Sequence, residues 1–220
     1  MVILSVSDVV KKALYSEATK TLFADVDLVV GCGDLPYYYL EFIADALNTP
    51  VLFVRGNHDP LVEMHLDGER RGPLGAVDLH RRVVNFEGVL FAGLEGSMRY
   101  REGGLMYSER RMWLMALMLV PRLVWNRVVH GRYLDILVTH SPPAGIHDQE
   151  DLPHRGFKPI RWLIKTFQPD LHIHGHTRVY QRRRTETRLG KTRILNTYTY
   201  QKTEYENQQS AENRKDGRKR

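Results

Sequence analysis

The chain has 220 residues, of which 42% are hydrophobic and 26% charged, and its formal net charge is +6. This length suffices for one sizeable domain with a full core, and the composition is that of a globular protein rather than a fibrous or disordered one. The single cysteine, Cys32, excludes an intrachain disulfide and a zinc site built on several thiolates. A bound metal would therefore need His, Asp, Glu or Asn ligands.

The N-terminal residues predict a strand rather than an export signal. They form a short apolar run that lacks the basic region and the long apolar region of a signal peptide. We therefore expect a cytoplasmic protein.

Apolar runs of strand length recur along the chain, and helix-like segments lie between several of them. The predicted strands are Val2–Val6, Leu28–Val30, Val51–Val54, Val89–Ala92, Ile136–Val138 and Leu171–His174, and the clearest helices are Tyr38–Leu47 and Lys158–Phe167. Alternating strands and helices predict a layered α/β domain whose sheets are buried on both faces. Residues 83–86, 179–184 and 191–200 predict further strands in antiparallel hairpins.

One segment, residues 107–130, is unlike a surface helix. Its stretch Met112–Val120 is apolar on every side but too short to span a bilayer, which takes about 20 residues. Pro121 is expected to end or kink a helix there. Three interpretations stay open: a core helix under the sheet, a homodimer interface or cap over the active site, and a membrane-surface contact through 112–130, which the flanking arginines favour.

The domain assignment follows from these patterns. Residues 1–205 form one domain, with 107–130 as an apolar helical insertion or cap. Residues 206–220 are charged and lack apolar periodicity, which predicts a disordered tail.

Residues that can bind metals follow the ends of five predicted strands. They are Asp8, Gly33-Asp34, Gly56-Asn57-His58-Asp59, His140 and His174-Gly175-His176. In α/β sheets, ligands bind beyond the carboxyl ends of the strands, so these side chains are expected to converge. Each block alone is weak evidence, but all five in this position predict a metal centre.

These blocks resemble the ordered motifs of the calcineurin-like metallophosphoesterases over residues 1 to about 200. The resemblance implies a four-layered α/β/β/α sandwich with two mixed sheets, a two-metal centre and hydrolysis of phosphoric esters. It implies that Asp34 bridges the metals, that Asn57, His140 and His176 complete one site, and that His58 protonates the leaving group. Asp8 would serve the other metal, and Asn57 would also contact substrate.

The sequence departs from the family pattern at two positions. Val10 and Arg178 replace histidines that would both bind the metal held by Asp8. Either Arg178 supplies the missing positive charge beside a single metal, or a second metal uses substitute ligands such as Tyr37, or the chain is a scaffold with little catalysis. His174 is a further candidate ligand, Arg99 a candidate substrate contact, and His147 and His154 are expected to be structural.

The predicted function is metal-dependent hydrolysis of phosphoric esters by a phosphodiesterase or phosphatase. The cofactor would be one or two divalent ions of Mn, Fe, Zn or Ni, which suit imidazole and carboxylate ligands. The substrate would be a phosphorylated small molecule, a nucleotide or a lipid. The alternative is a non-catalytic interaction module on the same fold, whereas the absence of a nucleic-acid-reading motif argues against a nucleic-acid partner.

Overall fold

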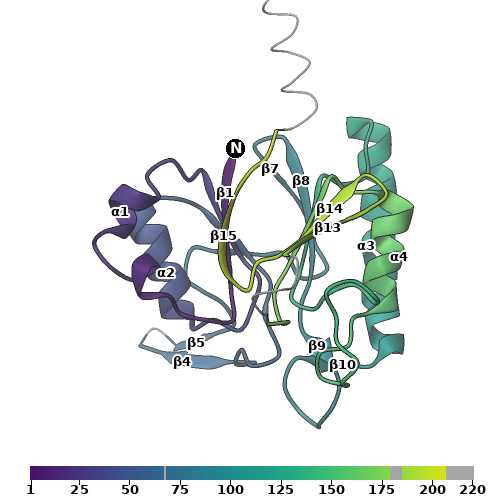
Figure 1. Cartoon of the computed structure of the whole chain (residues 1–220), viewed down its shortest axis with the longest axis horizontal. Coiled ribbons are helices and arrows are strands. Elements are labelled where there is room, and N and C mark those ends of the chain that lie inside the picture. Colours follow the sequence, from purple (N-terminus) through teal and green to yellow (C-terminus); the bar gives the residue numbers. More distant parts are fainter. Residues whose placement is uncertain (67, 179–184, 207–220) are drawn as a thin grey trace, which may run out of the picture.

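Two mixed β-sheets face each other, and helices cover the outer face of each (Figure 1). The computed structural model describes residues 1–66, 68–178 and 185–206. The predicted tail therefore lies outside the described residues except for its first residue, Glu206, as does the strand predicted at 179–184.

The first sheet has five strands in the order β15-β1-β2-β3-β6. The strands are β1 (Val2–Ser7), β2 (Leu28–Gly31), β3 (Val51–Phe53), β6 (Val77–Asp78) and β15 (Thr199–Glu204). The four strands from β1 to β6 are parallel, and β15 runs antiparallel to β1. The carboxyl ends of β1, β2 and β3 consequently meet at one edge.

The second sheet has six strands in the order β13-β14-β12-β11-β8-β7. They are β7 (Val83–Phe86), β8 (Val89–Leu94), β11 (Ile136–Thr139), β12 (Leu171–His174), β13 (Glu186–Leu189) and β14 (Thr192–Asn196). The central four strands are parallel, and β7 and β13 are antiparallel edges. Both sheets are thus mixed.

Helices complete the outer layers. The first sheet carries α1 (Thr19–Leu22) and α2 (Tyr37–Leu47), and the second carries α3 (Glu109–His130) and α4 (Lys158–Phe167), on the opposite side of the molecule (Figure 1). A short 3-10 helix, Lys12–Leu14, precedes α1. The four-layered α/β/β/α sandwich predicted from the sequence is confirmed.

Smaller pairs of strands lie outside the two sheets. They are β4 (Glu63–His65) with β5 (Gly68–Arg70), and β9 (Ser97–Met98) with β10 (Met106–Tyr107). The sequence did not predict them, because short, half-exposed strands lack the apolar run that marks a buried strand.

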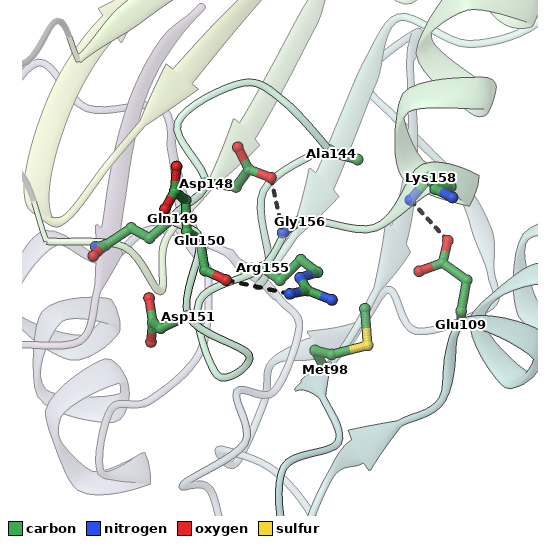
Figure 2. Close-up of a pocket in the computed structure, with 10 residues that line it drawn as sticks. All are labelled: Met98, Glu109, Ala144, Asp148, Gln149, Glu150, Asp151, Arg155, Gly156 and Lys158. Carbon is green, nitrogen blue, oxygen red and sulfur yellow. Dashed lines mark hydrogen bonds between the residues drawn. The ribbon is translucent and has the colours of Figure 1, made fainter.

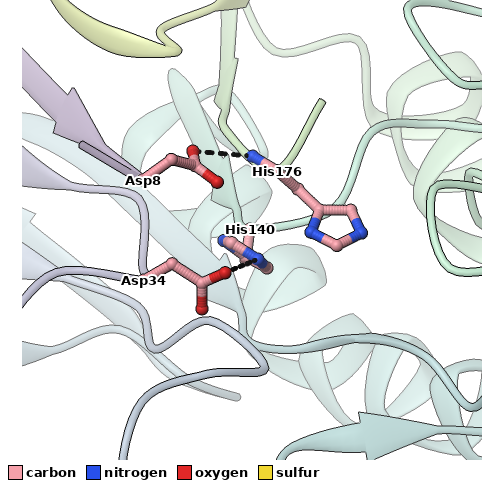
Figure 3. A group of neighbouring side chains, drawn as sticks. All are labelled: Asp8, Asp34, His140 and His176. Carbon is pink, nitrogen blue, oxygen red and sulfur yellow. Dashed lines mark hydrogen bonds and ion pairs between the residues drawn. The ribbon is translucent and has the colours of Figure 1, made fainter. Parts of the chain in front are cut away.

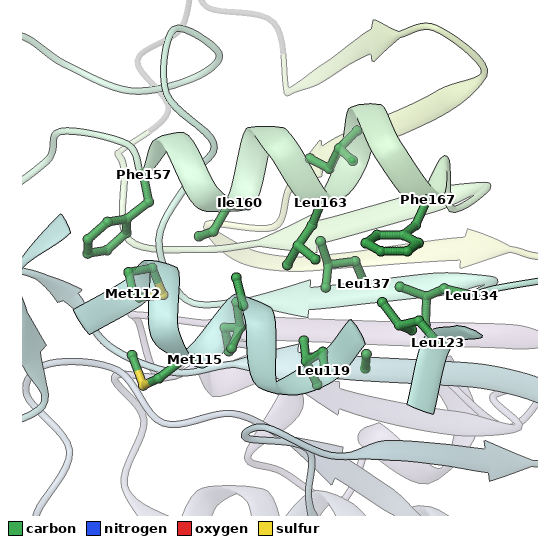
Figure 4. Packing of buried hydrophobic residues seen from close by; sticks show 14 of the residues in the cluster. Met112, Met115, Leu119, Leu123, Leu134, Leu137, Phe157, Ile160, Leu163 and Phe167 are labelled. Atoms are coloured by element: carbon green, nitrogen blue, oxygen red, sulfur yellow. The ribbon is translucent and has the colours of Figure 1, made fainter. Parts of the chain in front are cut away.

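The apolar segment forms one long helix of the outer layer. The inward side chains of α3, among them Met112, Met115, Leu119 and Leu123, pack against α4 and the second sheet (Figure 4). Their spacing of three or four residues places them on a single face. The helix does not end at Pro121, contrary to one expectation, because the side chains on both sides of the proline anchor it to the same core.

By length and composition α3 could also cross a bilayer. Its most apolar 18-residue window has a mean hydropathy of 1.3, and 33% of that window is buried inside the protein. The buried face packs α3 against α4 and the second sheet, so α3 is a helix of the outer layer of the sandwich.

The predicted strand 191–200 divides into two. β14 lies beside β12 in the second sheet and runs parallel to it, whereas β15 pairs with β1 in the first sheet. The chain therefore crosses between the sheets near Thr197 and Tyr198, where the Thr197 hydroxyl bonds the Ser5 hydroxyl of β1 at 2.5 Å. Hydrophobic pattern alone does not reveal such a change of sheet.

Candidate metal centre

Four acidic and imidazole side chains converge where strands of the two sheets end (Figure 3). Asp8 follows β1, Asp34 follows β2, His140 follows β11 and His176 follows β12. One ligand atom from each lies within 4.8 Å of the others. Each sheet contributes two of the four, so the pairing of the sheets assembles the group.

The ring of His140 is fixed in an orientation that suits metal binding. Its Nδ1 donates to the carbonyl oxygen of Cys32 at 2.7 Å, and the side chain is fully buried. Its Nε2 therefore points at the other atoms of the site, 3.4 Å from Asp34 Oδ2 and 3.1 Å from Asn57 Oδ1. Such outer contacts set the tautomer of metal-binding histidines.

Electrostatics at this site favour a cation. Burial opposes charge on both groups, but the Asp34 carboxylate raises the pKa of His140, and His140 in turn lowers the pKa of Asp34. In the absence of metal, a proton on His140 Nε2 balances the carboxylates. A divalent ion competes for the same place, because Asp34, Asn57 and His140 all offer electron pairs to it.

His176 is held in a similar way from the opposite sheet. Its Nε2 donates to the carbonyl oxygen of Pro153 at 2.7 Å, which leaves Nδ1 unprotonated in the neutral ring. Burial, reinforced by the charge of His140, lowers the pKa of His176 to about 3. Its backbone N–H donates to Asp8 Oδ2 at 2.9 Å and so joins the two strand ends.

The backbone is strained at three of the four residues. Asp8, Asp34 and His176 have φ values of 64°, 57° and 67°, in the left-handed region that side chains other than glycine rarely adopt. Strain of this kind gathers at functional sites, where the surrounding structure holds it.

Glycines leave room for the carboxylates. A Cβ on Gly56 would collide with Asp34 Oδ1, and one on Gly175 would lie 2.5 Å from Ser7 Oγ and 2.7 Å from Asp8 Oδ2. Both glycines are therefore required by close approach of the strand-end loops.

Asp59 organises the loop that carries Asn57 and His58. Its carboxylate accepts the backbone N–H groups of Gly56, Asp34 and Leu35 at 2.6, 3.0 and 3.1 Å. In return, Asp34 Oδ1 accepts the backbone N–H of His58 at 2.8 Å. These bonds lock the loops after β2 and β3 together.

A cleft of about 300 Å³ opens onto the group. Its lining residues are Asp8, Asp34, His58, His154, His176, Arg178 and Tyr198. His58 and Arg178 are both exposed at this cleft. Val10, the other departure from the family pattern, is 37% exposed and is not among these residues.

Three further candidates lie elsewhere. Tyr37 is buried at the start of α2, and its hydroxyl donates to the carbonyl oxygen of Pro60 at 3.2 Å. The ring nitrogens of His174 face His147 and the Gly175 carbonyl oxygen, at 2.9 Å each. Arg99 is exposed beyond β9, outside the cleft lining. The structure therefore gives none of the three a place in the group.

Two residues that line the cleft, His154 and Tyr198, were not predicted as site residues from the sequence. His154 was expected to be structural, yet it lines the cleft, and its ring centroid lies 5.2 Å from that of His176. Its Nδ1 bonds Asp151 Oδ2 at 2.6 Å. His154 and Tyr198 lie in loops rather than directly after an apolar strand, so the strand-end pattern gave no signal for them. His147, in contrast, bonds His174 and Thr187 and does not line the cleft.

A larger cavity of about 1120 Å³ lies beside the loop that carries His154 (Figure 2). Its polar groups largely brace the loop: Asp148 accepts the backbone N–H groups of Gly145 and Gly156, and Glu109 accepts that of Lys158. Asp151 lines this cavity and bonds His154, which links it to the cleft. None of the four converging side chains lines it.

The donor set fits a divalent transition metal. Two carboxylates and two imidazoles match the ligands such ions prefer, and Asn57 adds an amide oxygen. Asn57 Nδ2 is buried with no hydrogen-bond partner among the described residues, although its Oδ1 lies beside His140 at the site.

Comparison with known proteins agrees with this site. A family model for calcineurin-like phosphoesterases matches residues 1–180. The crystal structure of TT1561 from Thermus thermophilus is similar, with 17% identity and a TM-score of 0.59 over 90% of this chain and 89% of that one. A second crystal structure has 14% identity and a TM-score of 0.60 over 90% of each chain.

These structural likenesses show the fold alone, and no protein with a curated description matches the sequence. The family model covers most of the chain, including every block that supplies the group. The chain belongs to the calcineurin-like phosphoesterase family.

Proposed function

We propose that this protein is a metal-dependent hydrolase of phosphoric esters. The observation that carries the proposal is the orientation of His140, whose Nε2 is directed at Asp34 and Asn57 by the bond from Nδ1 to the Cys32 carbonyl oxygen. Asp34, Asn57, His140 and His176 would hold one ion, and Asp8 lies within reach of the same group. Bound there, a divalent metal would polarise phosphoryl oxygens and activate water.

Two residues of the loop after β3 would act on the ester itself. Hydrolysis breaks a P–O bond, and the departing oxygen must gain a proton. His58 lines the cleft beside Asp34, to which its own backbone is bonded, and its imidazole would donate that proton. Asn57 Nδ2 would donate a hydrogen bond to a phosphoryl oxygen.

Arg178 would replace part of a second metal. It lines the cleft together with Asp8. In the family pattern two histidines would bind the same metal as Asp8, and Val10 and Arg178 stand in their places. A guanidinium stays protonated and has no electron pair for a metal, but it binds phosphate oxygens through two parallel N–H groups. We therefore favour one metal and a phosphate-binding arginine.

The second candidate function is a non-catalytic binding module on the same fold. The two lost histidines favour it. The intact set of Asn57, His58, His140 and His176 favours catalysis, because a pure scaffold has no use for an imidazole at the cleft mouth.

Metal content tests the proposal. Purified protein should contain about one transition-metal ion per chain and hydrolyse bis-p-nitrophenyl phosphate, with loss of activity in chelator. His140→Ala should lose the metal and the activity, whereas His147→Ala, in a neighbouring histidine outside the group, should keep both. Metal bound equally well by His140→Ala would refute the ligand assignment, and bound metal without hydrolysis of any phosphoric ester would support the binding module.

A further inference from the structure

The outward face of α3 carries exposed apolar side chains as well as arginines. The exposed apolar side chains of this outer face are Leu114, Leu117, Met118, Val124, Trp125, Val128 and Val129. Val128 is 75% and Trp125 61% exposed. At 3.6 residues per turn these positions, with the exposed Pro121, form one continuous stripe about 22 Å long. A contiguous apolar surface of this kind marks an interaction site.

The charged residues of α3 and α4 are basic with one exception. Together α3 and α4 contain seven basic residues, Arg110, Arg111, Arg122, Arg127, Lys158, Arg161 and Lys165. Their one acidic residue, Glu109, accepts the backbone N–H of Lys158 at the base of the two helices. Arg110, Arg111 and Arg122 are exposed at the start and the flank of the stripe.

We propose that the outer face of α3 binds the surface of an anionic lipid bilayer. The helix would lie parallel to the membrane plane, with Trp125 and its apolar neighbours among the upper acyl chains and the arginines at the anionic headgroups. An apolar stripe bordered by basic side chains, with an exposed tryptophan, has the chemistry of interfacial helices. Each basic residue near such a surface adds to the attraction.

A second copy of the chain fits this face less well. In a two-fold contact the same patch meets itself, so the arginines of one copy would face those of the other. Neither α3 nor α4 offers an acidic side chain at the stripe to pair with them. In addition, α3 lies with α4 in the outer layer on that side of the molecule (Figure 1), so its exposed face is open to a membrane surface.

Vesicle binding by the full chain tests the proposal, independently of the hydrolase activity. The parent protein should sediment with vesicles of equimolar phosphatidylcholine and phosphatidylglycerol, and much less with phosphatidylcholine alone. Trp125→Glu combined with Val128→Glu should lower the partition coefficient at least about tenfold, because two carboxylates would enter the apolar layer. Both residues are exposed, so the thermal midpoint should not change.

The control carries the same charge change elsewhere. Met64 and Leu66 are also exposed, at 76% and 99%, on the β4–β5 hairpin. Met64→Glu combined with Leu66→Glu should bind vesicles as the parent does. Comparison of the two double variants separates the contribution of the outer face to vesicle binding from that of the overall positive charge and of the basic C-terminal residues.

Three results would overturn the proposal. The first is failure of the parent to bind anionic vesicles at all. The second is equal binding by the two double variants, which would assign the attraction to basic residues elsewhere. The third is a dimer, detected by light scattering, that only Trp125→Glu/Val128→Glu dissociates and that binds no vesicles, which would make the face an interface between copies.

Discussion

At the scale of single residues, the candidate metal centre depends on the orientation of the histidine rings. His140 and His176 each donate one ring N–H to a backbone carbonyl oxygen, of Cys32 and of Pro153, so that the other ring nitrogen faces the group. The two carbonyls come from different parts of the chain. The tautomers are thus fixed by tertiary structure, and mutation of the ligands alone would not reveal this support.

His58 provides the first test of the chemistry. His58→Ala should lower turnover of an alkyl phosphodiester about 10²–10⁴-fold, the usual contribution of a general acid. Metal content should not change, because the backbone N–H rather than the ring of His58 contacts Asp34. An activated nitrophenyl ester needs little protonation of its leaving group and should be affected much less. Equal losses for both esters would contradict the acid role.

Arg178 provides a test of phosphate binding. Arg178→Ala should raise KM about 10–100-fold, as expected from loss of a charged hydrogen-bond pair, with metal content unchanged. Arg178→Lys should recover only part of the affinity, since an ammonium group cannot bind two oxygens in parallel. Arg155→Ala, on the wall of the larger cavity, serves as the matched control. An unchanged KM in Arg178→Ala would place the side chain outside the reaction.

The paired replacement Val10→His with Arg178→His tests whether Arg178 has replaced a second metal. If the arginine occupies the place of a second metal, the variant should bind one more ion per chain than the parent. Two ions already present in the parent, measured by metal analysis, would contradict the substitution.

The sequence was sufficient for residues that directly follow a strand. Asp8, Asp34, His140 and His176 were predicted because apolar strands mark their own carboxyl ends, and the structure brings these four together. The position of His154 in the cleft was not predicted, because it depends on how the loop between β11 and α4 folds back onto His176. Loop conformation depends on tertiary contacts that have no period in the sequence.

At the scale of elements, α3 shows how packing overrides local preference. Pro121 lies inside the helix and lacks the N–H that would bond the carbonyl of Leu117. The helix continues because Met112, Met115 and Leu119 before the proline and Leu123 after it are buried in one cluster. The sequence shows that Pro121 is unfavourable in a helix, but it does not show how much the burial of these side chains compensates.

Pro121→Ala should therefore stabilise the protein by about 1–2 kcal/mol. Alanine restores a helical hydrogen bond, and part of this gain is offset because the unfolded chain gains conformational entropy when the proline is removed. The side chain is exposed, so packing should not change. Urea denaturation measures the effect, and Arg122→Ala at the next exposed position should change stability by only a few tenths of a kcal/mol. A loss of stability in Pro121→Ala would show that the proline geometry is itself required.

At the scale of the whole molecule, the second sheet buries polar residues as well as apolar ones. His172 and His174 on β12 are both fully buried, and Asn196 beside them donates to Thr177. Three histidines, at 172, 174 and 176, are consequently held neutral within one short segment. The sequence predicted His174 as a candidate ligand but could not reveal this common consequence for acid stability, which depends on burial.

His172 shows that consequence most clearly. The Thr139 hydroxyl donates to the Ser141 carbonyl oxygen, so it accepts the Nε2 proton of His172 at 2.8 Å, and the buried Nδ1 has no partner among the described residues. Burial, with a smaller contribution from His147, lowers the pKa of His172 from 6.5 to about 3. Between pH 6.5 and about 3 the imidazole of His172 is thus protonated in the unfolded chain but neutral in the folded chain. The free energy of unfolding therefore decreases as the pH falls from 6.5 toward 3.

Metal-free protein should accordingly lose about 2 kcal/mol of unfolding free energy through His172 between pH 7 and pH 5. His172→Leu removes this titration, so its stability should decline less steeply over that interval, whatever its stability at pH 7. Thr139→Val removes the hydrogen-bond partner but keeps the imidazole, and it should keep the parent's slope. Urea denaturation in chelator at the two pH values measures both slopes. Equal slopes for His172→Leu and the parent would mean that the buried ring does not set the acid sensitivity of this fold.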